Sequence, residues 1–120
     1  MRIDDTRPIW IQLAEIFRAR ITDGTWKPGQ KIPSVRDLAI EASTNPNTVQ
    51  RALAALDEEG LTVTKRTAGR FVATDDVALH ALRKANAQAA ADAYISACRA
   101  LGVEREQAHS LIDERWDADT

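Results

Sequence analysis

The chain has 120 residues, of which 44% are hydrophobic and 28% are charged. A chain of this size and composition buries one modest core, which excludes a large multidomain enzyme and a disordered protein. There are 16 Lys and Arg residues and 18 Asp and Glu residues, and the net charge of −2 excludes a chain that is basic throughout. A single cysteine rules out an internal disulfide, and no apolar secretory leader opens the sequence, so we expect a cytoplasmic protein.

Charge is distributed unevenly on the two sides of Thr74, where the last predicted strand ends. Residues 1–74 hold eleven cations and nine anions, whereas residues 75–120 hold five cations and nine anions. Residues 60–73 contain three cations and no acid, so a polyanion is expected to bind there. We divide the chain at this point into two predicted domains, residues 1–74 and 75–120.

The first predicted helix covers residues 8–24. A proline suits the first helical position at one end, and a glycine suits the stop at the other. Between them, apolar side chains recur at the spacing of one helix face. These side chains are Ile9, Leu13, Ile16, Phe17 and Ile21.

Two short helices joined by a tight turn are predicted next. Ser34 and Asp37 have the spacing of a capping box, so the first of the two begins at Ser34 and lasts about three turns. Asn45 is a good N-cap for the other helix, and Pro46 suits its first position because no amide is needed there. Gly60 ends this helix. Its inward face consists of Val49, Ala52, Leu53 and Leu56.

Residues 61–73 are predicted to form a small hairpin. Leu61 and Val63 alternate with threonines, Gly69 is a turn residue, and an apolar run resumes at Phe71. The order helix, turn, helix, basic hairpin is that of a winged helix-turn-helix, in which the second of the two helices lies in the DNA major groove.

The last 46 residues are predicted to form two helices. Asp75 and Asp76 favour the start of an alanine-rich helix that runs to Leu101 and stops at Gly102, and its charged residues exclude a membrane span. Its small apolar side chains form a narrow seam along its whole length, and a last helix over residues 104–116 covers only part of this seam. A second copy of the chain is therefore expected to cover the rest, which favours a homodimer over a helix packed only on its own domain. The expected dimerisation residues are Leu82, Ala85, Ala89, Ala93, Ala97, Leu111 and Ile112.

The fold class that follows is mainly α with a small β-hairpin wing, a winged helix-turn-helix followed by a short two-helix dimerisation segment. The helix that begins at Pro46 presents short or planar polar side chains, of which Asn and Gln can pair with adenine and Arg with guanine. Any solvated helix face has a similar composition, but the neighbouring cations of the hairpin favour phosphate contact. The candidate DNA-binding residues from this reasoning are Asn47, Thr48, Gln50 and Arg51 in the helix and Lys65, Arg66 and Arg70 in the hairpin.

Residues 26–39, Trp-Lys-Pro-Gly-Gln-Lys-Ile-Pro-Ser-Val-Arg-Asp-Leu-Ala, resemble the signature of GntR-family transcription regulators. Residues 45–53 resemble the recognition helix of that family, residues 59–61 the start of its wing, and residues 8–13 the opening of its first helix. The resemblance covers residues 6–73, and the short remainder is similar to the YtrA-like subfamily. It implies a DNA-binding regulator whose targets include its own operon and neighbouring transporter genes.

The resemblance also implies roles for individual residues. Arg36 matches an arginine that contacts phosphates and bases in the family, and Gly69 matches the small residue at the wing tip. The alternative for Arg36 is a surface salt bridge to Asp37 or Glu41, which would contribute little to stability. Several family members place arginines where this chain has Pro46 and Gln50, so their base contacts do not transfer. Base reading is expected to shift to Asn47, Thr48, Gln50 and Arg51.

The leading hypothesis is a sequence-specific transcriptional repressor that binds a pseudo-palindromic operator in double-stranded DNA as a homodimer. The alternative is a winged-helix protein-interaction module, and the two differ in how steeply added salt weakens binding. We expect no enzyme, cofactor or metal site, because His80 and His109 are far apart in the sequence and Cys98 lies among alanines within a helix. The last two helices are too small to enclose an evident pocket, so the sequence identifies no effector.

Overall fold

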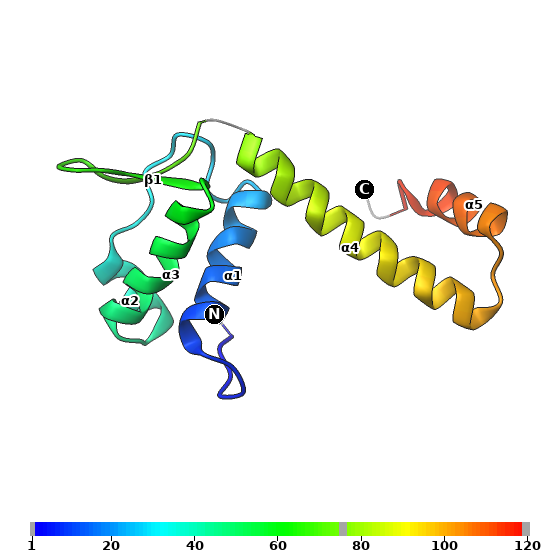
Figure 1. The fold of residues 1–120 in the computed structure, drawn as a ribbon, viewed down its shortest axis with the longest axis horizontal. Coiled ribbons are helices and arrows are strands. Elements are labelled where there is room, and N and C mark those ends of the chain that lie inside the picture. Colours follow the sequence, from blue (N-terminus) through cyan, green and yellow to red (C-terminus); the bar gives the residue numbers. More distant parts are fainter. Residues whose placement is uncertain (1, 75–76, 119–120) are drawn as a thin grey trace. The chain divides into compact units, whose positions relative to one another are not determined.

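The computed structural model describes residues 2–74 and 77–118. Five helices and one antiparallel hairpin are found in these residues, so the predicted fold class is confirmed (Figure 1). The chain divides into two units, Met1–Leu82 and Arg83–Thr120. The elements in order are α1 (Ile9–Thr22), α2 (Val35–Ala42), α3 (Pro46–Glu58), β1 (Thr62–Lys65), β2 (Gly69–Val72), α4 (Val77–Leu101) and α5 (Arg105–Arg115).

The predicted ends of the first three helices are confirmed, and local chemistry explains them. Pro8 occupies the N-cap position of α1. The Ser34 hydroxyl accepts a hydrogen bond from the Asp37 amide at 3.1 Å, and the Asn45 side chain accepts one from the Asn47 amide at 2.7 Å. These bonds satisfy amides that have no partner within a helix. The caps therefore fix the residues at which α2 and α3 begin.

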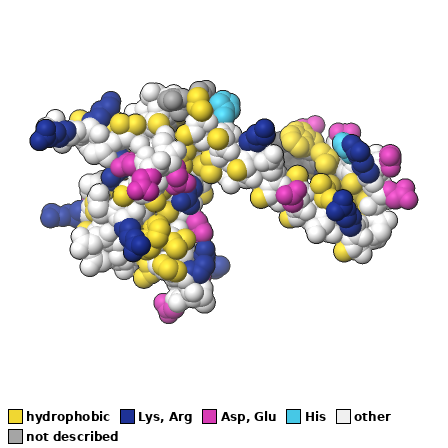
Figure 2. All heavy atoms as spheres, viewed as in Figure 1, with side chains coloured by type: hydrophobic (Ala, Val, Ile, Leu, Met, Phe, Trp, Pro, Cys, Tyr) yellow, Lys and Arg dark blue, Asp and Glu magenta, His cyan; other side chains and the backbone are white. Residues whose placement is uncertain are grey.

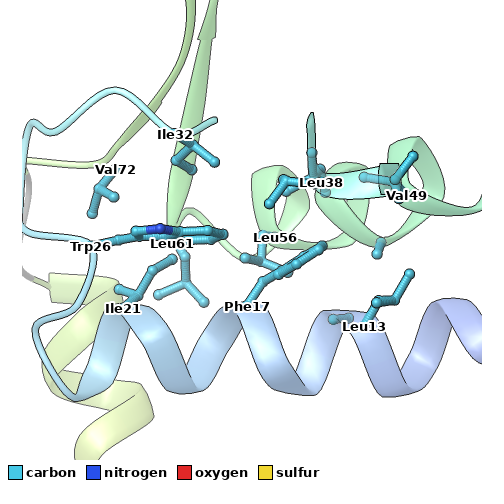
Figure 3. Packing of buried hydrophobic residues seen from close by; sticks show 14 of the residues in the cluster. Leu13, Phe17, Ile21, Trp26, Ile32, Leu38, Val49, Leu56, Leu61 and Val72 are labelled. Atoms are coloured by element: carbon cyan, nitrogen blue, oxygen red, sulfur yellow. The ribbon is translucent and has the colours of Figure 1, made fainter. Parts of the chain in front are cut away.

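The core of the first unit lies between α1, α2, α3 and the base of the hairpin (Figure 3). The ring centroids of Phe17 and Trp26 are 5.5 Å apart, and both side chains are buried. The inward residues of α3 are fully buried as expected, which leaves the other side of α3 outside the core. The core also includes Leu79, so the first turns of α4 belong to this unit.

The hairpin has two different faces. Val63 pairs with Phe71 and Thr64 pairs with Arg70, so Thr62, Thr64 and Arg70 share one face. Thr62 is buried on that face, whereas Val63 is 47% exposed on the other. The apolar alternation therefore identified the hairpin but not its buried face, because the hydroxyl of Thr62 hydrogen-bonds to a carboxylate of α3.

The second unit consists of the remainder of α4 and of α5. The Tyr94 hydroxyl donates to the carbonyl oxygen of Ala108 at 2.8 Å, and partial desolvation raises its pKa. Gly102 ends α4 at a φ of +75°, as expected. The expected helix-starting acids, Asp75 and Asp76, lie outside the described residues. Among the residues that the structure describes, no helix combines the length and apolar composition that a membrane span needs.

Candidate nucleic-acid interface

The N-terminal half of α3 presents polar side chains away from the core. Asn47, Gln50 and Arg51 are exposed, and Thr48 is half-buried at the edge of this face. The cap at Asn45 and the proline after it leave the first amides of α3 at a positive dipole end. This half of α3 thus has the groups that base edges and phosphates need.

Arg51 is held by an aromatic side chain that the sequence analysis did not identify. Its guanidinium lies 4.3 Å from the ring centroid of Trp10 in α1, which is a cation–π contact. A guanidinium stacked on a ring keeps its N–H edge free for hydrogen bonds. Trp10 therefore restricts Arg51 without occupying its donors. The only signal in the sequence is that Trp10 lies just outside the apolar stripe of α1.

Cations gather at the end of the hairpin (Figure 2). The Lys65 ammonium lies 4.7 Å from the ring centroid of Phe71, on the hairpin face that carries Val63. Arg66 is exposed in the turn that joins β1 to β2. These two residues form the cationic wing tip.

Gly69 follows the turn at a φ of +111°, which L side chains rarely adopt. A Cβ at this position would lie 2.9 Å from Cε of Lys31, so glycine allows the Lys31 side chain to cross the hairpin. Lys31 itself pairs with Phe71 in an isolated bridge. Lys31 lies within the motif of residues 26–39, but its place beside the wing could not be predicted, because it depends on a contact with Gly69, 38 residues away in the chain.

Arg70 differs from the other two cations of the hairpin. Its side chain is 12% exposed, and its Nη2 atom lies 2.9 Å from Oδ2 of Asp57 in α3. From the sequence Arg70 is expected to act with Lys65 and Arg66, because spacing alone does not reveal Asp57 as its partner. Its contact with DNA stays a prediction, and its guanidinium is engaged within the unit.

Arg36 is exposed in the first turn of α2. Within residues 2–74 and 77–118, its side chain makes no hydrogen bond or ion pair. The alternative partner Glu41 instead lies 3.0 Å from Arg20. The guanidinium of Arg36 is therefore available to a ligand.

The C-terminal end of α3 is acidic, in contrast to its N-terminal half. Asp57 is paired with Arg70, and Glu59 lies 2.7 Å from Nε of Arg18 in α1. Glu58 is exposed. Because a helix C-terminus also carries a partial negative charge, this end disfavours phosphate. A polyanion would thus bind the N-terminal half of α3 and the wing tip.

Residues 11–72 match the family model described as "Bacterial regulatory proteins, gntR family". The chain belongs to the GntR family. Its relatives include the HTH-type transcriptional repressor YtrA of Bacillus subtilis, which is 32% identical over 113 residues that cover 89% of this chain and 83% of YtrA. It is therefore a transcriptional regulator with a winged helix-turn-helix DNA-binding domain.

Two solved structures are similar to this chain over different lengths of it. A GntR family transcriptional regulator from Listeria monocytogenes has a TM-score of 0.78 and 31% identity, over 93% of this chain and 98% of that one. The DNA-binding domain of AraR, solved in complex with operator ORX1, has a TM-score of 0.57 and 26% identity, over 61% of this chain and 93% of that one. The first likeness thus extends through α4 and α5, beyond the winged domain.

The expected dimerisation residues of this GntR regulator lie in different settings. Leu82 packs against the core of the first unit, and Leu111 is half-buried. The expectation that α5 covers part of the seam is wrong, because α5 meets Tyr94 on another face of α4. The seam residues Ala85, Ala89, Ala93 and Ala97 are all exposed.

An open hollow of about 510 Å³ lies between α4 and α5. Its lining includes Cys98 and Ile112, with Arg99, Arg105 and His109 also present. The sequence analysis expected no evident pocket in this part of the chain, and the hollow is open rather than enclosed. Among the described residues, no group of His, Cys, Asp and Glu is placed to hold a metal ion.

Proposed function

We propose that this GntR regulator is a sequence-specific repressor that binds a pseudo-palindromic operator as a homodimer. The observation that carries the proposal is that Gln50, on the exposed polar side of α3, lines one hollow with Thr67, Ala68 and Gly69 at the end of the cationic hairpin. In this arrangement α3 reads base edges in the major groove while the wing and α2 hold phosphates. The proposed DNA contacts are Arg36, Asn47, Thr48, Gln50, Arg51, Lys65, Arg66, Gly69 and Arg70, with Arg70 acting from its pair with Asp57.

The similar proteins support both the DNA ligand and the direction of regulation. YtrA of Bacillus subtilis is named a transcriptional repressor, and the AraR domain was solved with an operator. Repression by occlusion of the promoter is the simplest mechanism for a regulator of this size. The proposal places the protein in the cytoplasm with the chromosome and gives it no catalytic role.

The second unit supports a homodimer. The seam of α4 is uncovered, and Ile112 remains 42% exposed. Small side chains let another helix approach closely, and two-fold symmetry would present two recognition helices to two half-sites. The proposed interface residues are Leu82, Ala85, Ala89, Ala93 and Ala97 of α4 and Leu111 and Ile112 of α5.

A salt titration tests the DNA-binding part of the proposal. The duplex is an inverted repeat from the region upstream of the coding sequence, and binding is followed by fluorescence anisotropy. We expect a dimer to neutralise roughly four to eight phosphates, which gives a log–log slope of about −4 to −7. A slope near zero would contradict the proposal and favour a winged-helix module that binds a protein.

A further inference from the structure

Asp57, in the last turn of α3, binds three side chains of the hairpin through one carboxylate. Oδ2 accepts from the Thr64 hydroxyl at 3.0 Å and from Nη2 of Arg70 at 2.9 Å. Oδ1 accepts from the Thr62 hydroxyl and from Nε of Arg70 at 3.2 Å. A carboxylate has about four acceptor sites, so these partners use nearly all of them.

These three partners lie on one face of the hairpin and tie both strands to α3. Thr62 and Thr64 are in β1, and Arg70 is the cross-strand partner of Thr64 in β2. A two-stranded hairpin is only marginally stable by itself, so its orientation depends on what it packs against. The carboxylate of Asp57 thus links the recognition helix to both strands of the wing.

The cations of the wing tip depend on this link. Lys65 follows Thr64 directly on the opposite face of β1, and Arg66 follows in the turn. A rotation of the hairpin about α3 would move both cations relative to Asn47 and Gln50. Phosphates and bases have a fixed spacing on DNA, so both sets of contacts form together only at one hairpin angle.

We propose that Asp57 is a positioning residue that sets the wing against the recognition helix, so that α3 and the wing tip bind the same DNA site together. The inference rests on the proposed function, since it concerns how the DNA-binding face is held. It assigns Arg70 to the link between the wing and α3, in addition to any contact that Arg70 makes with phosphate.

The direction in which DNA affinity changes when Asp57 is neutralised distinguishes a positioning role from a purely electrostatic one. Asp57 is an acid close to a surface that binds a polyanion, so Coulomb repulsion alone predicts that its neutralisation tightens DNA binding. A positioning role predicts weaker DNA binding, because the freed wing no longer holds Lys65 and Arg66 at a fixed place relative to α3. A single neutral substitution therefore separates the two explanations.

The test compares Asp57→Asn with the matched control Glu58→Gln in the full chain. Both variants remove one acidic charge from the end of α3, but Glu58 is exposed on its outward side. We expect the Kd of Asp57→Asn for the parent's preferred duplex to rise about tenfold, and that of Glu58→Gln to stay equal or fall. An equal or lower Kd for Asp57→Asn would overturn the proposal.

A coupling measurement excludes a merely structural effect. Lys65→Ala should weaken binding of the parent several-fold but change the Kd of Asp57→Asn little, because the wing is already out of register there. If Lys65→Ala weakens both proteins equally, Asp57 does not act through the wing and the proposal fails.

If Asp57→Asn does not fold, Thr64→Val provides the same test at an exposed position. This variant removes one hydrogen bond of the link without changing any charge. We expect a several-fold higher Kd, and an unchanged Kd would overturn the proposal. Binding by the parent protein distinguishes the two proposals. A parent that binds no duplex contradicts the proposed function, whereas a parent that binds, with an unchanged Kd for Thr64→Val, contradicts only the role of Asp57.

Discussion

The two units of the chain differ in how far each buries its own apolar residues. In the first unit, large side chains from α1, α2, α3, the start of α4, the hairpin and the segment around Trp26 form one core. In the described part of the second unit, only Cys98 is nearly fully buried, and Leu101 and Trp116 are 79% and 76% exposed. The first unit thus completes a core by itself, whereas the second leaves large apolar side chains exposed.

The physical reason lies in side-chain size and in the number of elements. Burial stabilises a fold roughly in proportion to the apolar area removed from water, and alanine supplies little of that area. Two helices also cannot enclose a core. The alanine-rich α4 is therefore suited to close approach by a partner helix rather than to an independent fold.

Ala89→Glu tests whether the second unit joins two copies of the chain. The substitution places a charge in the α4 seam, where neither close approach nor burial survives, so we expect a folded monomer. Loss of the second recognition helix should raise the operator Kd about 10²-fold to 10⁴-fold. Analytical ultracentrifugation, circular dichroism and a gel-shift titration measure the three effects.

The control for this prediction is Ala87→Glu. Ala87 is also exposed on α4, but it lies on a different face from the seam. It should leave the dimer and its affinity unchanged. A monomeric Ala89→Glu protein that binds the inverted repeat as tightly as the parent would show that DNA recognition does not need this interface.

Phe17→Ala tests whether the stability of the first unit depends on its own core. Phe17 is fully buried against Trp26, so its loss should lower the free energy of unfolding by about 3–5 kcal/mol. Leu101→Ala in the second unit should change it by less than about 0.5 kcal/mol, because Leu101 is exposed. Urea unfolding followed by near-ultraviolet circular dichroism gives both values. Similar losses for the two variants would mean that the units do not differ as described.

Arg51→Ala tests the recognition of DNA bases separately from dimerisation. We expect a loss of about 1–3 kcal/mol in discrimination between operator and scrambled duplexes, with the dimer intact. Lys65→Ala should instead weaken both duplexes about equally, because phosphate contacts carry no sequence information. Affinities for the two duplexes measure the difference. An equal loss on both duplexes for Arg51→Ala would reduce its role to phosphate contact.

Features that depend on neighbouring residues in the sequence could be predicted. The caps at Ser34 and Asn45 follow from side chains two or three positions away, and the inward face of α3 follows from its periodicity. The order of the elements could be derived from such signals, because each element begins and ends through local chemistry.

Features that depend on tertiary contacts could not be predicted. Arg70 carries the same charge as Lys65, but the register of the hairpin places it on the face that meets Asp57. Trp10 meets Arg51 across two helices, and α5 packs away from the seam that it was expected to cover. In each case, the partner is distant in the sequence or is selected by which face packs inward.

The positions of the three tryptophans give this protein a built-in set of optical probes. Trp26 lies in the core beside Phe17, Trp10 lies against Arg51 of α3, and Trp116 is exposed just after α5. Intrinsic fluorescence from these rings therefore reports the core, the surroundings of Arg51 and the surroundings of the second unit separately. Replacing two tryptophans at a time with phenylalanine would isolate each signal without attaching any dye.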